Sequence, residues 1–359
     1  MDTVIRRSCT RERQPAATRL CTLVRAASLT NFAEVARLAG LNPDRLLLDA
    51  GLTPAMLSEP DLMVPADRVR WLLETTARKA GDEAFGLRMA MTRQLSNLGP
   101  VGLVIRDQPT ARAAIQVLMR HHAALNGALA MNLVDNGSLV QVCEELLPTF
   151  PAQPTRQSIE LAVGVLFVVL RHLLGSDWRP QKVCFMHAAP LDTTAHLRLL
   201  GPRVEFRQDF NGIVCLASEL DASNPQADPL MGRYAQRLLD ALPGDDAAST
   251  LDEVRRTIAL LLPSGRCNIE QVSAHMGLVP RTVQRRLADS GRSFSELVNE
   301  LRVGLAQRHI VHGDRSLTDV ATLLGFAALS GFSRWHQQQF HCSPSQSRSA
   351  QASPGGGHH

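Results

Sequence analysis

Arg281, Arg285 and Arg286 surround Gln284 in the short stretch VPRTVQRRLADSG. On a helix, residues three and four positions apart are neighbours, so Arg281, Gln284 and Arg285 would share one face. An arginine guanidinium can donate two hydrogen bonds to guanine, and a glutamine amide can pair with adenine in the same two-point manner. Arg286 and Thr282 flank this face and suit phosphate contacts. The stretch predicts a surface that reads double-stranded DNA, and the alternative is an ordinary solvated helix.

The segment in front of this stretch occurs twice in the chain. Ile269–Gly277 (IEQVSAHMG) aligns with Leu317–Gly325 (LTDVATLLG), and a small residue, Ser273 or Ala321, stands one helical turn before each glycine. Two helices that cross steeply over a short turn need a small side chain where they touch, and a glycine where the turn takes a positive φ. The repeat therefore predicts two helix-turn-helix units.

The second helix of each unit carries the polar residues. We expect these helices over Pro280–Asp289 and Leu329–Phe340, with Val283, Leu287 and Phe332 turned toward the core. The outer face of the later helix then presents a second polar set, which consists of Ser330, Ser333, Arg334 and Gln337. One such hairpin would be weak support, but two, each with an arginine on its outer face, favour DNA binding over a solvated surface.

Strand patterns are confined to the part of the chain before the segment PGDDAAST. Two apolar runs flank Asn136 and Gly137, and this dipeptide is a strong hairpin signal. Further strands are expected over Val183–Pro190, Val204–Phe206 and Gly212–Ala217, the last two joined by a loop with an Asn-Gly pair. Between these strands, apolar residues recur with helical spacing. The pattern predicts an α+β domain.

The whole chain has 359 residues, which is enough for two domains with separate cores. We expect the α+β domain over residues 20–243, a linker over 244–250, and an all-α domain over 251–350. In the all-α domain, a long helix over Phe294–Val311 would join the two helix-turn-helix units. The segment from Ser264 to Ala350 contains ten arginines and six acidic residues. Its charge of +4 equals the net charge of the whole chain and favours a polyanion partner.

Other classes of protein receive little support. Seven cysteines are scattered without a CxxC pair, as in a cytoplasmic protein with reduced thiols. The longest apolar run, Leu161–Leu170, is shorter than the roughly 20 residues of a membrane span. No GxSxG, HExxH, P-loop or GxGxxG motif occurs in a fitting context. We therefore expect no catalytic residues, no metal site and no cofactor.

From Leu251 to Ala350 the chain resembles the AraC/XylS family of bacterial transcription regulators. The closing signature of that family is matched by Phe332, Arg334, Ser343, Pro344 and Arg348. The resemblance implies a DNA-binding regulator, an activator as most of the family are, with promoter DNA and RNA polymerase as partners. Three positions depart from the pattern: His336 and Ser347 replace aromatic residues, and His341 replaces glycine. The loss of two aromatic residues predicts a less stable second unit.

The N-terminal part resembles, through segments such as LMVPADRV, FGLRMA and FMHAAP, the sensor domain of one branch of these regulators. That domain is not a cupin barrel, and the resemblance implies a small organic effector and a homodimer. We place the effector beside Phe185, Met186 and His187, because an apolar strand with one ionisable group suits a mostly apolar pocket. Three alternatives stay open: these residues are ordinary core, His187 and Cys184 serve an enzyme, or the protein shapes DNA without any effector.

Overall fold

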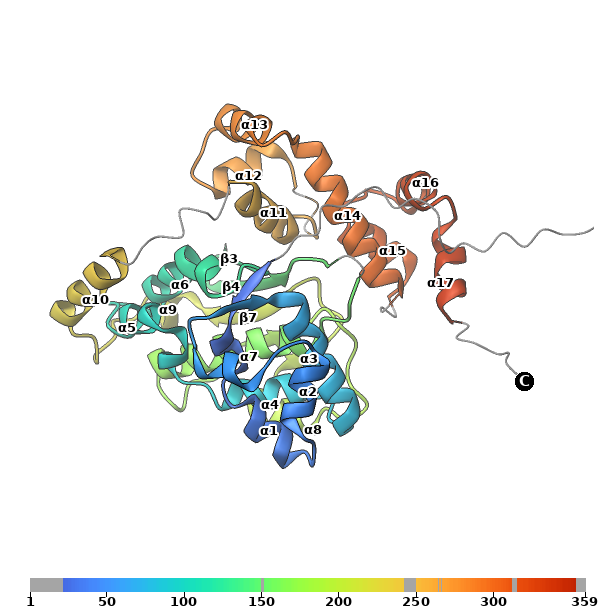
Figure 1. Ribbon diagram of the computed structural model, residues 1–359. Coiled ribbons are helices and arrows are strands. Elements are labelled where there is room, and N and C mark those ends of the chain that lie inside the picture. The colour runs from blue at the N-terminus through green and yellow to red at the C-terminus, as the bar shows by residue number, and fades with distance from the viewer. Residues whose placement is uncertain are drawn as a thin grey trace, which may run out of the picture.

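The computed structural model describes residues 22–149, 152–241, 250–263, 265, 267–311 and 315–352. Within them an α+β domain is followed by an all-helical domain, which confirms the predicted fold class. In Figure 1 the helical domain lies along one side of the α+β domain. The predicted domain start at residue 20 and the predicted linker, apart from Thr250, lie outside the described residues.

A mixed five-stranded sheet with the order β3-β4-β7-β5-β6 forms the centre of the N-terminal domain. Its strands are β3 (Leu129–Asn136), β4 (Leu139–Leu146), β5 (Lys182–Cys184), β6 (Val204–Glu205) and β7 (Asn211–Leu216). β3 and β4 form the predicted hairpin, in which Asn136 pairs with Leu139 and Gly137 has a φ of +67°. A separate antiparallel pair joins β1 (Leu23–Arg25) to β2 (Met63–Pro65). The larger sheet is open at β3 and β6, unlike the jelly roll of a cupin.

The helices of this domain pack around α7 (Arg156–Leu174), which contacts β4, β7, α3 and α4. The others are α1 (Phe32–Leu38), α2 (Pro43–Asp49), α3 (Ala66–Ala80), α4 (Phe85–Met91), α5 (Pro100–Arg106), α6 (Ala111–Leu125), α8 (Thr194–Leu200), α9 (Ala217–Leu220) and α10 (Pro229–Ala241). By length and composition, α7 could cross a membrane. However, 11 of its 19 residues are buried in the domain, so α7 is the core helix of this fold.

Two predicted details of the sheet are wrong. β5 ends at Cys184, earlier than predicted, and the next turn is held by a side chain, because Asn211 Oδ1 accepts a hydrogen bond from the Met186 backbone N–H at 2.8 Å. Asn211 and Gly212 belong to β7 rather than to a loop. A Cβ atom at Gly212 would lie 2.0 Å from the carbonyl oxygen of Val142. The glycine therefore permits close strand contact instead of marking a turn.

The C-terminal domain contains the predicted long helix with one helix-turn-helix unit toward each end (Figure 1). Its helices are α11 (Thr250–Leu261), α12 (Ile269–His275), α13 (Pro280–Asp289), α14 (Phe294–Val311), α15 (Leu317–Leu323), α16 (Leu329–Phe340) and α17 (Pro344–Ala352). Both units share one hydrophobic core, which includes Val272, Val283, Val320 and Phe332. Leu147, which follows β4 in the N-terminal domain, belongs to the same core.

Candidate nucleic-acid interface

The first helix-turn-helix unit consists of α12 and α13. The Asn268 side chain caps α12 by accepting a hydrogen bond from Gln271 N at 2.8 Å. Ser273 is fully buried, as expected for a small residue at a helix crossing, and Gly277 takes a φ of +65° in the turn. Pro280 starts α13, where its fixed φ and missing N–H cost nothing.

On α13, apolar and polar residues occupy opposite faces. Val283 and Leu287 are buried, whereas the predicted DNA-contacting residues Arg281, Gln284, Arg285 and Arg286 are exposed and Thr282 is half-buried. Within the described residues, the guanidinium groups of Arg281 and Arg285 make no hydrogen bond or ion pair, and Arg286 has only a 3.5 Å contact with the Thr250 hydroxyl. The structure therefore brings the first predicted set together on one solvent-facing surface.

The second unit, α15 and α16, repeats this arrangement. The Ser316 hydroxyl caps α15 by accepting a hydrogen bond from Asp319 N at 3.1 Å, and Gly325 takes a φ of +72° in the turn. Phe332 is buried, and its ring packs against Phe326 and Trp335. The predicted polar set faces outward: Ser330, Arg334 and Gln337 are exposed, and Ser333 is half-buried.

Polar contacts of α14 fix both units to the same helix. Near its N-terminal end, Glu300 accepts a hydrogen bond from Arg255 of α11 at 3.1 Å and also pairs with Arg292. Further along, Arg302 donates to the carbonyl oxygen of Leu324 at 2.9 Å and lies over the Phe326 ring. Side chains of α14 thus contact a segment next to each helix-turn-helix unit: Arg292, which follows α13, and Leu324 and Phe326, which follow α15.

The imidazole ring of His336 occupies the core position where the family pattern has an aromatic side chain. Its ring is 1% exposed and lies 4.4 Å from the Phe340 ring centroid, and Nδ1–H donates to the Cys342 carbonyl oxygen at 2.9 Å. The Ser347 hydroxyl, at the other departure, lies 3.0 Å from Cys342 Sγ. The second unit is therefore hydrogen-bonded at both positions and packed at His336, and its lower stability stays a prediction.

Burial lowers the pKa of His336, although the hydrogen bond to Cys342 acts in the opposite direction. Above pH ~6.5 both folded and unfolded forms carry a neutral imidazole. As the pH falls below that value, the unfolded state takes up the proton first, so stability decreases. We expect the His336→Phe variant to lose less stability than the wild type between pH 6.5 and about 5. Urea unfolding at several pH values measures this slope, and equal slopes would exclude His336 as a contributor.

His341 stands where the family has glycine, and its φ of +56° lies in the left-handed region. For a residue with a Cβ this conformation costs roughly 1–2 kcal/mol. Glycine avoids this cost, but its unfolded chain has a larger conformational entropy, which offsets part of the stabilisation. His341→Gly is therefore expected to raise the free energy of unfolding by about 0.5–1 kcal/mol. His341→Ala keeps the strained backbone and serves as the control in chemical denaturation. A loss of stability in the glycine variant would contradict this explanation.

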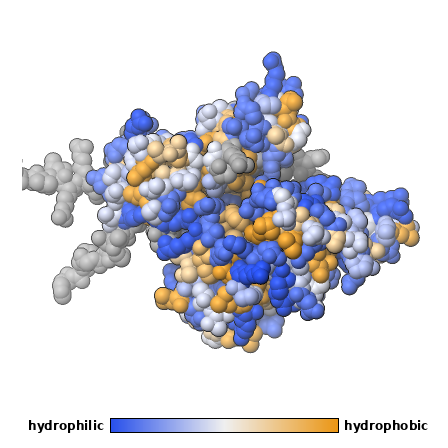
Figure 2. Space-filling model, turned by 180° about the vertical axis from the view of Figure 1, so that it is seen from behind, coloured by the Kyte–Doolittle hydropathy of each residue, from blue (hydrophilic) through white to orange (hydrophobic). Residues whose placement is uncertain are grey.

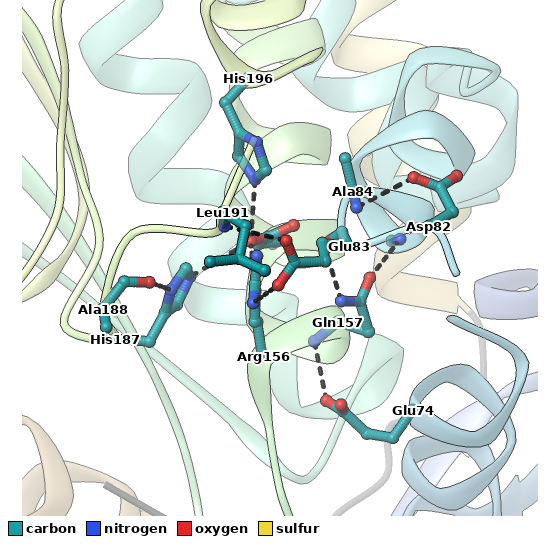
Figure 3. A network of polar contacts seen from close by, with 12 residues as sticks. Glu74, Asp82, Glu83, Ala84, Arg156, Gln157, His187, Ala188, Leu191 and His196 are labelled. Carbon is teal, nitrogen blue, oxygen red and sulfur yellow. Dashed lines mark hydrogen bonds and ion pairs between the residues drawn. The ribbon is translucent and has the colours of Figure 1, made fainter. Parts of the chain in front are cut away.

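The predicted effector residues lie in the N-terminal domain, in the turn after β5, where aromatic and histidine rings pack together. After β5, the rings of Phe185 and His187 pack together at 5.0 Å. Both His187 and His196, which Figure 3 labels, lie within ion-pair distance of the buried carboxylate of Glu160. Glu160 Oε1 lies 2.9 Å from His196 Nε2 and also accepts from Arg156. The cavity among β1, α3, α6, β3, β4 and α7 lies elsewhere, and its lining does not include Phe185, Met186 or His187. An effector beside these residues stays a prediction.

The enzyme alternative for His187 and Cys184 gains no support from the geometry. Burial raises the pKa of the Cys184 thiol to about 11, so the thiolate needed for a nucleophile is scarce at neutral pH. Among the described residues, no group of three or more His, Cys, Asp or Glu side chains could hold a metal ion. The five described cysteines are all free.

Sequence reasoning missed the contact between the two domains. Arg308 of α14 donates to Glu145 at 2.6 Å and to the Leu146 carbonyl oxygen at 3.1 Å. Arg315, just before α15, donates to the Met186 carbonyl oxygen at 2.8 Å. Both guanidinium groups are buried. We call the segment Glu144–Leu147 the β4 junction, because it consists of the end of β4 and the next residue and also contacts the helical domain. The surplus of arginine was the only signal of these contacts.

Two joined helix-turn-helix units, each with exposed polar residues on its second helix, define a double helix-turn-helix DNA-binding protein. Residues 40–224 match the family of the N-terminal arabinose-binding domain of AraC transcription regulators, and residues 272–350 match a helix-turn-helix domain family. The chain belongs to the AraC family of transcription regulators. Both domain families indicate a regulator and not an enzyme.

Individual proteins that are similar to this chain are named as regulators. The chain is 28% identical to the HTH-type transcriptional regulator VirS of Mycobacterium tuberculosis, over 92% of this chain and 97% of VirS. It is 23% identical to the ornithine utilization regulator of Pseudomonas aeruginosa, over 82% of this chain and 87% of that protein. The crystal structure of the transcriptional regulator CdpR from Pseudomonas aeruginosa is similar over 85% of this chain and 96% of CdpR, with 18% identity and a TM-score of 0.42.

Proposed function

We propose that this regulator activates transcription in the cytoplasm by binding promoter DNA and contacting RNA polymerase. In this proposal, α13 and α16 enter two successive segments of the major groove. The contacts are made by Arg281, Thr282, Gln284, Arg285, Arg286, Ser330, Ser333, Arg334 and Gln337. The observation that carries the proposal is the pair of outward polar faces fixed to one helix. The 18 residues of α14 span roughly 27 Å, which suits sites about 34 Å apart along the duplex if the DNA bends slightly.

A footprint tests this mode of binding. A DNA site is first selected from a random-sequence pool with the full-length protein, and hydroxyl-radical cleavage then maps the protected backbone. We expect two protected segments per protomer, on the same face of the duplex and about one helical turn apart. Protection of a single groove segment by each protomer would contradict the two-helix proposal.

We propose further that a small organic effector bound to the N-terminal domain controls DNA binding. The β4 junction supports this, because Glu144 and Leu146 face the interior of the sensor domain while Glu145 holds Arg308 of α14. A thermal-shift screen of metabolites tests for an effector, since a ligand at 100 times its Kd adds about 2.7 kcal/mol. DNA affinity is then measured with and without each hit. A hit that leaves DNA affinity unchanged would argue against control.

A homodimer is proposed through α10. This helix leaves four large apolar side chains between 46% and 63% exposed, namely Leu230, Met231, Tyr234 and Leu238. Leu230, Tyr234 and Leu238 follow one another at helical spacing, so they form a stripe that a second copy could cover. In Figure 2, where α10 lies toward the right-hand end, this end is mostly hydrophilic and shows a small orange hydrophobic area.

Leu238→Glu would place a charge in the centre of such an interface. We expect this variant to shift the protein from dimer to monomer in analytical ultracentrifugation, because burying an unpaired carboxylate is costly. Leu38→Glu, at an exposed leucine on α1, is the matched control. A variant at position 238 that sediments like the wild type would exclude the α10 stripe as the interface.

A further inference from the structure

The N-terminal domain contains a cavity of about 160 Å³. It lies among β1, α3, α6, β3, β4 and α7, and most of its wall is apolar. Val69, Leu73, Leu118, Leu129, Leu161 and Val165 contribute to this wall. An engineered cavity of about 150 Å³ can hold benzene, so the volume suits a ligand of roughly six to nine non-hydrogen atoms.

Four buried polar atoms of this wall have no hydrogen-bond partner among the residues that the structure describes. They are the hydroxyl oxygens of Ser28 and Ser158, Nε2 of His122 and Oε2 of Glu144. Glu144 is only 4% exposed. Native proteins leave few buried polar groups unpaired, because each one has lost its water without gaining a partner. Four such atoms around one cavity point to a ligand that supplies the missing hydrogen bonds.

The unpaired Nε2 of His122 calls for a hydrogen-bond donor, and so does the Glu144 carboxyl when it is ionised. His122 Nδ1 lies 2.6 Å from the Met119 carbonyl oxygen, so Nδ1 carries the proton and Nε2 is left as an acceptor. Burial lowers the pKa of His122 to about 4, which keeps this imidazole neutral. Burial raises the pKa of Glu144 to about 8, and no charged group offsets that effect. A cation beside Glu144 would therefore stabilise its ionised form.

Three arginines also line the cavity, but their hydrogen bonds are directed to the protein. Arg25 pairs with Asp61, Arg70 donates to the Leu147 carbonyl oxygen at 3.1 Å, and Arg93 donates to two backbone carbonyl groups, one at 2.7 Å. These contacts hold the walls of the cavity together. An anionic ligand would need to compete with them, whereas a donor group can bind Glu144 and His122 directly.

We propose that this cavity binds a small, largely apolar primary amine, with its ammonium group against Glu144 and His122. The proposal names the effector site of the regulator, and it relies on the proposed function only for the link to DNA. That link is short, because the neighbouring Glu145 holds Arg308 on the opposite face of β4. A ligand that moves Glu144 would also move β4, and Glu145 of the same strand pairs with Arg308 of the helical domain.

Calorimetric titration of the full-length protein with benzylamine and n-hexylamine at pH 7 tests the site. Benzyl alcohol and benzoate are the matched probes without a cation. We expect both amines to bind at least about tenfold more tightly than benzyl alcohol, as hydrogen bonds to charged groups do, and benzoate to bind least. Tighter binding of benzoate, or no binding of any probe by a protein that still binds DNA, would overturn the cavity assignment while leaving the regulator intact.

Two variants locate the binding. Glu144→Gln should weaken benzylamine binding by about tenfold and leave benzyl alcohol within about twofold. Glu59→Gln makes the same change at an exposed position and should have no effect. Ala162→Leu enlarges a lining residue of α7 and should weaken all probes alike. Circular dichroism confirms that each variant folds. Unchanged amine binding in both Glu144→Gln and Ala162→Leu would show that the amines bind elsewhere.

Discussion

Replacing Arg308 with alanine is expected to cost about 3–5 kcal/mol of stability, the largest effect of any substitution we predict. Arg308 and Glu145 are 8% and 6% exposed, and their side chains are 2.6 Å apart. Removing the guanidinium leaves a buried carboxylate without its cation, with only the Asn211 amide and the Leu146 N–H as donors among the described residues, and also frees the Leu146 carbonyl oxygen. Both groups would lose hydrogen bonds that water cannot replace unless the domains separate.

Urea unfolding, followed by fluorescence and by circular dichroism, measures this loss. An early transition seen by only one probe would indicate that the domains separate before they unfold. The double variant Arg308→Met with Glu145→Leu is the control, because replacing a buried ion pair by apolar residues is often neutral. If Arg308→Ala unfolds at the same urea concentration as the wild type, the ion pair does not hold the domains together.

The second large effect concerns DNA. Arg285→Ala should weaken binding to the selected site by about 1–3 kcal/mol if its guanidinium forms the two-point contact with guanine. The loss of affinity should depend on the base at one position, because the Arg285 guanidinium is exposed and makes no hydrogen bond or ion pair with the described part of the protein. Gel-shift titrations on the selected site and on single-base variants measure affinity and specificity together.

Two other arginines, one on α13 and one on α16, are the comparisons. Arg286→Ala should weaken binding to all sequences similarly, since a phosphate contact carries no base information. Arg334→Ala tests the second unit, and with His336 packed in its core we expect a loss comparable to that of Arg285→Ala. If Arg286→Ala instead relaxes one base position, the roles of Arg285 and Arg286 are exchanged.

The helical domain could be predicted almost residue by residue from the sequence, because its steric requirements are local. A small residue at the crossing, a glycine in the turn and a proline at the start of α13 restrict where each helix can begin and end. The boundaries of α13, α14 and α16 agree with the prediction. Two copies of one pattern also exclude most accidental matches.

The sheet and its cavity could not be predicted, because they depend on contacts between distant segments. β5 lies between β6 and β7, and nothing in three short apolar runs sets that order. One signal for the cavity was available. Glu144 has the same parity along β4 as Val140 and Val142, so an inward-facing carboxylate could have been read from the hairpin alone.

Leu147 has a practical consequence for anyone who divides this protein at its domain boundary. It contributes to the hydrophobic core of the helical domain although it follows β4, and Arg308 finds its partners on the same strand. A helical domain produced alone would expose the apolar surface that Leu147 covers. It would also leave the Arg308 guanidinium without Glu145. We expect such a fragment to self-associate, and addition of the separate N-terminal domain to restore its solubility, as two halves of a split protein do when they share a core.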